Sequence, residues 1–257
     1  MKLFEIRKEA REALRGKWGK GVSIVLAYLV IAFIIGFITG IFEENSIISF
    51  VLAIVELIVS VPLSFGLAFA FLKLKRNEDV GAFEFIEMGI SNFSKSWRIA
   101  GRTILKLVLP IIAIIGALLA YIGLVVYSAM QLTLGGVESV GSIMIIGVVI
   151  YILAIVYYVS VSLLYSLTSF IAYDNKEMTA SEIVNESAKL MKGNRCKFVL
   201  LELSFLGWAI LTVFTLGIGY LWLLPYMYVA KVCFYEYLLG KNETNEPEEN
   251  FGPIKEM

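Results

Sequence analysis

The stretch GVSIVLAYLVIAFIIGFITGIF, residues 21–42, decides the fold class of this chain because it carries no charged side chain. An α-helix needs about 20 mostly apolar residues to cross the hydrocarbon core of a bilayer. The stretch is too long for the apolar part of a signal peptide, and no small-residue cleavage site closes it. We therefore interpret it as a retained transmembrane helix.

The composition of the whole chain extends this interpretation. Of 257 residues, 59% are hydrophobic and 17% are charged, whereas soluble domains run at about 45–50% and about 25%. The pattern predicts an all-α, polytopic transmembrane bundle, formed by residues 1–240, with an acidic cytoplasmic tail over 241–257 that has too little apolar content to fold. Its six predicted spans are residues 21–42, 47–72, 103–129, 142–172, 198–216 and 218–239.

Lysine and arginine predict the orientation of the spans. They occur before the first span, around the second and fourth linkers, and in the tail, but none occurs in the three intervening loops at 43–46, 130–141 and 217–219. Cytoplasmic loops carry an excess of these residues. We therefore expect both termini in the cytoplasm.

An amphipathic stretch precedes each pair of spans, which suggests a threefold internal repeat. The first stretch has apolar residues at helical spacing over 3–14, the second keeps a 3-4 rhythm from Phe83 to Trp97, and the third begins at a capping box, Thr179 to Glu182. The alternative is that any cytoplasmic linker of an alternating membrane protein has this pattern.

Amphipathic helices with aromatic residues on one side and cations on the other lie at the lipid headgroups. We expect the lipid bilayer, in particular anionic phospholipid, to be the partner of these stretches. The candidate headgroup contacts are Lys2, Lys8, Arg11, Arg15, Lys17, Trp18, Trp97, Arg98, Lys192 and Arg195.

Ionisable residues inside spans are functional candidates because charge in hydrocarbon is costly. Glu202 and Lys231 lie at similar depths of adjacent antiparallel helices, so we predict an ion pair between them. Glu56 lies near the middle of the second span. We predict that it joins a polar path, or is a neutral group hydrogen-bonded between helices; the other members of the path are Ser49, Ser60, Ser64, Tyr151, Tyr158, Ser162, Tyr165 and Ser169.

Enzymatic signatures do not emerge from the sequence. The chain has no histidine and two distant cysteines, Cys196 and Cys233, which removes the commonest general base and the usual metal-ligand clusters. No phosphate-binding loop, nucleophile elbow or zinc motif occurs. We expect no enzyme activity, catalytic residue, metal or cofactor, and no nucleic-acid partner. Gly36 and Gly40 form a GxxxG pattern, which leaves association with a second copy open.

Motifs at both ends of the chain resemble those of a known family. The C-terminal third contains SAKLMKG (187–193), LSFLGW (203–208), TLGIG (215–219) and LWLLPY (221–226), then Ala230 and FYE (234–236); the N-terminus contains IRKEAR (6–11) and GKWG (16–19). The chain resembles the bacterial integral-membrane family called domain of unknown function 975. That resemblance implies a bacterial cytoplasmic-membrane protein and brings no established activity. The chain also looks distantly similar to the membrane domain of glycerophosphodiester phosphodiesterases, whose soluble catalytic domain has no counterpart here.

Three functions remain open from sequence. The first is a non-catalytic membrane protein that acts through lipid or protein contacts. The second is a small proton- or cation-linked transporter or channel that uses the polar path near Glu56. The third is a membrane-embedded enzyme acting on lipid with carboxylates and hydroxyls alone.

Overall fold

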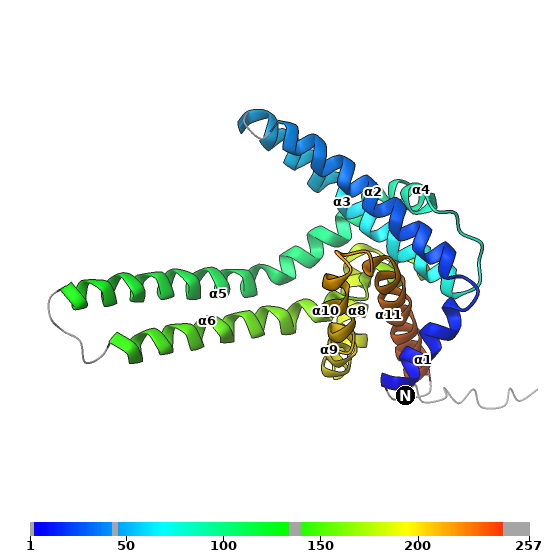
Figure 1. The fold of residues 1–257 in the computed structure, drawn as a ribbon. Coiled ribbons are helices and arrows are strands. Elements are labelled where there is room, and N and C mark those ends of the chain that lie inside the picture. The colour runs from blue at the N-terminus through cyan, green and yellow to red at the C-terminus, as the bar shows by residue number, and fades with distance from the viewer. Residues whose placement is uncertain (1–2, 43–45, 134–139, 244–257) are drawn as a thin grey trace, which may run out of the picture. The chain divides into compact units, whose positions relative to one another are not determined.

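Helices make up the chain throughout the part described by the computed structural model, residues 3–42, 46–133 and 140–243, and no strand occurs within these ranges. Figure 1 shows their arrangement. The elements are α1 (Leu3–Leu14), α2 (Trp18–Ile41), α3 (Ser46–Lys75), α4 (Glu84–Ser91), α5 (Phe93–Thr133), α6 (Val140–Ser162), the 3-10 turn η1 (Leu163–Tyr165), α7 (Thr168–Asp174), α8 (Ala180–Met191), α9 (Arg195–Leu203), α10 (Leu206–Phe214) and α11 (Tyr220–Glu243).

Five stretches of helix are long and apolar enough to cross a membrane: Trp18–Ile41, Ile47–Lys75, Phe93–Met130, Met144–Asp174 and Arg195–Phe214. The prediction of an all-helical, multi-pass membrane protein is thereby confirmed. Large apolar side chains cover the outside of these helices, as expected for a surface that contacts lipid; Phe33, for example, is 72% exposed.

The predicted sixth span, α11, does not belong to this group, so the count of six is not confirmed. The helix is 24 residues long, but Lys231, Glu236 and several tyrosines lower its hydropathy. Its middle is among the most deeply buried parts of the described chain, with Val229, Ala230 and Phe234 fully inaccessible. The helix ends at Glu243, and the rest of the predicted tail lies outside the described residues.

The described chain divides into two compact units. The first combines residues 1–57, 66–88 and 197–257, and α11 forms its centre. Helix α1 packs against α11 and buries Ile6, Ala10 and Leu14. From α3, Phe71 stacks on Tyr228 of α11, with ring centroids 4.9 Å apart.

The second unit combines residues 58–65 and 89–196. Its largest feature is the long antiparallel hairpin of α5 and α6, whose two arms pack along each other (Figure 1). Helix α8 begins at the predicted capping box, in which Thr179 and Glu182 bond each other's backbone N–H groups. The same helix buries Ile183 and Met191, and Ser187 donates a hydrogen bond to the Leu164 carbonyl at 2.8 Å.

The element order repeats a short helix followed by a longer helical pair, but the order alone does not establish three related units. The segments that join α1 to α2 and α8 to α9 each contain a glycine in the left-handed region, Gly16 (φ +78°) and Gly193 (φ +80°). The described segment that joins α4 to α5 contains none. In the second amphipathic stretch, Phe83 and Ile90 are 62% and 63% exposed. Phe85 is buried instead, against the Tyr28 ring.

Pro62 creates a local problem in α3 that Trp97 resolves. Proline has no N–H, so the carbonyl four residues earlier, that of Ile58, loses its helical partner. The Trp97 indole Nε1 donates to this carbonyl at 3.0 Å. Gly89 of α4 lies directly on the same turn, since a Cβ there would come within 2.5 Å of the Pro62 carbonyl oxygen. Trp97, a predicted headgroup contact, thus engages the chain's own backbone.

We expect Trp97→Phe to destabilise the protein by about 1–3 kcal/mol, because the Ile58 carbonyl then has no donor in an apolar setting. Pro62→Ala restores an N–H at position 62 that can bond Ile58. Trp97→Phe should therefore cost much less on a Pro62→Ala background, a coupling that a double-mutant cycle of thermal unfolding in detergent measures. Equal costs on both backgrounds would contradict this role of Trp97.

Candidate functional site

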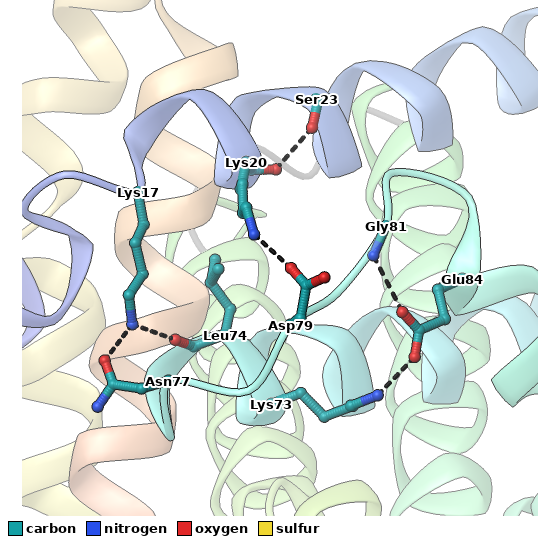
Figure 2. A network of polar contacts seen from close by, with 9 residues as sticks. All are labelled: Lys17, Lys20, Ser23, Lys73, Leu74, Asn77, Asp79, Gly81 and Glu84. Atoms are coloured by element: carbon teal, nitrogen blue, oxygen red, sulfur yellow. Dashed lines mark hydrogen bonds and ion pairs between the residues drawn. The ribbon is translucent and has the colours of Figure 1, made fainter.

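The α1–α2 junction is fixed onto the loop that follows α3 (Figure 2). Helix α3 ends in a Schellman motif: Asn77, at φ +65°, donates to the Leu74 carbonyl, and Glu78 donates to the Lys73 carbonyl. Lys17 Nζ donates to the Leu74 carbonyl at 3.0 Å and to the Asn77 side chain. A cation at this position is favourable because the C-terminus of a helix carries partial negative charge.

Two further ion pairs hold the same loop. Lys20 pairs with Asp79, and Lys73 pairs with Glu84. The Gly81 backbone N–H donates to Glu84 Oε2 at 3.0 Å. The Lys73 hydrogen bond, followed by that from Gly81, holds the pKa of Glu84 below its ordinary value. The Lys20 hydrogen bond lowers the pKa of Asp79 in the same way.

A second ionic cluster joins α1, α3 and α11. Lys75 pairs with Glu236 and, at 3.0 Å, with Glu9. Arg76 Nε lies 3.1 Å from Glu236 Oε1. Two carboxylates and two cations thereby connect three helices within the first unit. The lysines and arginines that the sequence assigns to topology also serve here as structural ties.

The structure brings Glu202 and Lys231 together, with Lys231 Nζ 3.5 Å from Glu202 Oε1. The pair lacks hydrogen-bond geometry, since Glu202 Oε1 is buried without a hydrogen-bond partner among the described groups. Lys231 Nζ also lies 5.7 Å from the centroid of the Tyr228 ring, close enough for a cation–π interaction.

The predicted polar path is not assembled at one place within either unit. Ser49, Ser64 and Ser162 donate to backbone carbonyls, namely those of Phe42, Val61 and Val159. Glu56 is exposed and belongs to the first unit, while the path residues Tyr151, Tyr158, Ser162, Tyr165 and Ser169 belong to the second and Ser60 and Ser64 lie in the α3 segment grouped with them. That the two stripes face each other stays a prediction.

The predicted headgroup contacts separate into two sets. Lys8, Arg11, Arg15, Arg98 and Lys192 are exposed. The others engage the chain itself: Lys17 and Trp97 as described, Arg195 by donating to Ser160 at 3.0 Å, and Trp18 by lying 6.4 Å from the Tyr226 ring. Lys2 lies outside the described residues.

An aromatic cavity of about 390 Å³ in the first unit is a feature that sequence reasoning missed. Its lining includes Trp18, Trp208, Trp222 and Tyr226, together with one cation, Arg11. These residues come from α1, α2, α10 and α11, and no local pattern connects them. The sequence offered one signal for it: of the four tryptophans, Trp18 begins a helix, and Trp208 and Trp222 lie on the last helix pair.

The residues described at these sites can bind a ligand through charge, hydrogen bonds and apolar contact. The described residues contain no group of three histidine, cysteine or acidic side chains placed to hold a metal ion. The cations offer charge and hydrogen-bond donors, and the cavity offers apolar and aromatic surface. An amphiphile with an anionic head matches both.

The lowered pKa of Glu84 predicts an acid-sensitive stabilisation. The stability that it contributes is fully present above the ordinary carboxyl pKa of about 4.3 and is lost as the pH falls through the lower, folded-state pKa. We expect Glu84→Gln to be less stable near neutral pH and to lose less stability on acidification, as followed by thermal unfolding in detergent. Glu87→Gln, an exposed change on the same helix, should retain the wild-type pH profile; an unchanged profile in Glu84→Gln would refute the assignment.

Comparisons with known proteins gave one finding. No curated protein and no solved structure matches the chain. A family model described as "Protein of unknown function (DUF975)" matches residues 1–242, which is nearly the whole sequence and includes every helix described above. The chain therefore belongs to the DUF975 family.

Proposed function

We propose that this protein is a non-catalytic component of the bacterial cytoplasmic membrane, with both termini in the cytoplasm, that binds anionic phospholipid through its cytoplasmic face. The observation that carries the proposal is one face of α1. Phe4, Lys8, Arg11 and Arg15 follow each other at spacings of four, three and four residues, which places them on one side of a helix, and all four are exposed.

The opposite side of α1 supports this assignment. Ile6, Ala10 and Leu14 are buried in the packing of α1 against α11, so the helix is held in place and its exposed side is free to meet a membrane surface. Phe4 is 64% exposed, and an aromatic ring beside cations is typical of helices that lie among headgroups. Each cation near an anionic surface contributes about 1 kcal/mol.

The distribution of cations over the described chain agrees with the same function. Two further exposed cations follow the second and third amphipathic stretches: Arg98 near the start of α5 and Lys192 directly after α8. The half-buried charges around Lys75 and Glu84, by contrast, pair with one another. The polar path of the transporter alternative has no comparable support, because Glu56 is exposed and the hydroxyls of Ser49 and Ser64 donate to backbone carbonyls rather than to one another.

The proposed orientation is tested by thiol labelling. In a Cys196→Ser, Cys233→Ser background, single cysteines at Asn45 and Ser139 should react with an impermeant reagent added to intact cells, because both positions lie in predicted outer loops. A cysteine at Glu78, in the loop after α3, should react only after the cells are broken. Reaction of the Asn45 or Ser139 variant only in broken cells would refute the orientation.

The lipid function is tested by the double variant Lys8→Gln, Arg15→Gln. We expect the anionic phospholipid that co-purifies in mild detergent to fall by up to about thirtyfold, because two surface charges contribute about 2 kcal/mol. Raising the salt concentration should weaken retention by the wild type. Glu12→Gln, which removes an opposite charge from the same helix, should maintain or increase retention. Unchanged retention in the double variant would overturn the proposed function.

A further inference from the structure

The α10–α11 turn reaches much less far beyond the contacts of α11 with α2 and α3 than those two helices do. Phe71 stacks on Tyr228, and Lys75 pairs with Glu236, so α3 and α11 run in the same direction from these contacts. From Phe71, α3 extends back to Ser46, about 38 Å, whereas α11 extends from Tyr228 only to Tyr220, about 12 Å, at about 1.5 Å per residue. The hairpin turn thus falls about 25 Å short of the far end of α3.

Helix α2 gives the same result. It packs against α11, and a Cβ on Gly21 would lie 3.0 Å from Pro225. Beyond this contact α2 continues to Ile41, about 30 Å, while α11 continues to Tyr220 for about 8 Å. Since a hydrocarbon core is about 30 Å thick, a turn at this level lies inside the half of the core next to α1.

The chemistry of the turn suits hydrocarbon. Phe214, Leu216 and Ile218 are 81%, 94% and 60% exposed. Every backbone N–H from residue 215 to residue 223 donates to an acceptor within the hairpin, and the hydroxyls of Thr212 and Thr215 donate to carbonyls. Irregular backbone can lie at membrane depth only when its polar groups are satisfied. Leu216 even adopts a left-handed conformation, φ +51°, where glycine would be unstrained.

The aromatic cavity lies between this hairpin and the α1–α2 junction. Arg11 and Trp18 line the cavity beside Tyr226. Thr215 and Gly219 also line it, and Gly219 lies about 10 Å along α11 from Tyr226. Tyr226 is fixed in place: its hydroxyl donates to the Arg7 carbonyl at 3.2 Å, and its ring meets Phe205 edge-on at 4.9 Å. The volume of about 390 Å³ is in the range of small-molecule sites, about 300–1,000 Å³.

The lining specifies the occupant. An apolar cavity in hydrocarbon offers water too few hydrogen-bond partners to hold it, and an empty one forfeits dispersion contacts. Lipid chains are the apolar groups at hand. Arg11 donates to the neutral Tyr226 hydroxyl at 3.2 Å, and no carboxylate among the described residues pairs with it, so its charge is available to an anionic head at the rim.

We propose that the α10–α11 hairpin is re-entrant, turning back within the cytoplasmic leaflet, and that the cavity it forms with α1 and α2 binds one acyl chain of an anionic phospholipid whose phosphate pairs with Arg11. This site rests on the proposed lipid-binding function and locates it. It also agrees with the low hydropathy of α11, because a helix that does not cross the whole hydrocarbon core needs fewer apolar residues.

Thiol labelling tests the hairpin. In the background without native cysteines, a cysteine at Ile218 should stay unlabelled by an impermeant reagent in intact cells and in inverted vesicles, and should react after detergent solubilisation. The Asn45 cysteine, labelled from outside, is the matched control. Labelling of the Ile218 cysteine from either face of the intact membrane would overturn the re-entrant turn.

Quenching of tryptophan fluorescence tests the site, because Trp18, Trp208 and Trp222 line the cavity. In phosphatidylcholine vesicles, a minor fraction of brominated phosphatidylglycerol should quench the wild type more than the same fraction of brominated phosphatidylcholine. Arg11→Gln should reduce this preference about fivefold, the effect of one charge near a surface. Leu211→Phe, which fills the cavity, should reduce quenching by both lipids.

Matched controls separate the site from general effects. Lys176→Gln removes one exposed positive charge from the loop after α7, outside the proposed lipid-binding face. Leu206→Phe adds the same volume to α10 at a residue of equal exposure, 54%, that does not line the cavity. Both variants should quench like the wild type. If Arg11→Gln, or a folded Leu211→Phe variant, were quenched in the same way as the wild type, the site would be overturned and the proposed function would stand. If the wild type showed no preference for the anionic headgroup in quenching and none in co-purification, both the site and the proposed function would be overturned.

Discussion

Hydrocarbon offers no hydrogen-bond partners, and this constraint explains where the described chain departs from regular helix. Proline at position 62 leaves the Ile58 carbonyl without its helical donor, and the Trp97 indole supplies one at 3.0 Å. The α10–α11 turn meets the same constraint with its own backbone and with Thr215, whose hydroxyl accepts from the Gly219 N–H at 2.9 Å. Where α3 ends, Asn77 and Lys17 satisfy the last carbonyls. At each of these three places, the chain itself supplies the hydrogen-bond partner that the irregular backbone lacks.

Charge has a second, complementary role in the first unit. Lys75 and Arg76 meet Glu236 and Glu9, so the end of α3 ties α1 to α11. This arrangement holds the buried side of α1 in place, so that Phe4, Lys8 and Arg15 lie exposed on the opposite side. The lipid-binding face we propose depends on that anchoring, because a helix of 12 residues is marginal in water without tertiary packing.

Much of the helix content could be predicted from the sequence because hydropathy is a local property: five of the six predicted spans coincide with long apolar helices. The capping box at Thr179 could be predicted equally well, because it depends on two residues three positions apart. Counting residues from the cytoplasmic ends of two adjacent spans placed Glu202 and Lys231 at the same depth, and in the structure Lys231 Nζ lies 3.5 Å from Glu202 Oε1. The second amphipathic stretch was harder, because its 3-4 rhythm does not reveal that Phe85, off the stripe, packs on Tyr28. The cavity and the Trp97 bond join segments far apart in the chain, and no periodicity encodes such contacts.

The apolar, internally bonded turn at Leu216 has a consequence for biogenesis. Its neighbours carry no charged side chain between Leu203 and Ala230, so no polar loop has to be moved across the bilayer when this part of the chain inserts. The last helix pair can then enter the membrane from the face on which it is synthesised, after the long hairpins are in place. Assembly of the first unit, in which α11 packs against α1 and α2, would thus be completed only after α11 has been synthesised. A chain truncated before α11 would leave the N-terminal helix without its support.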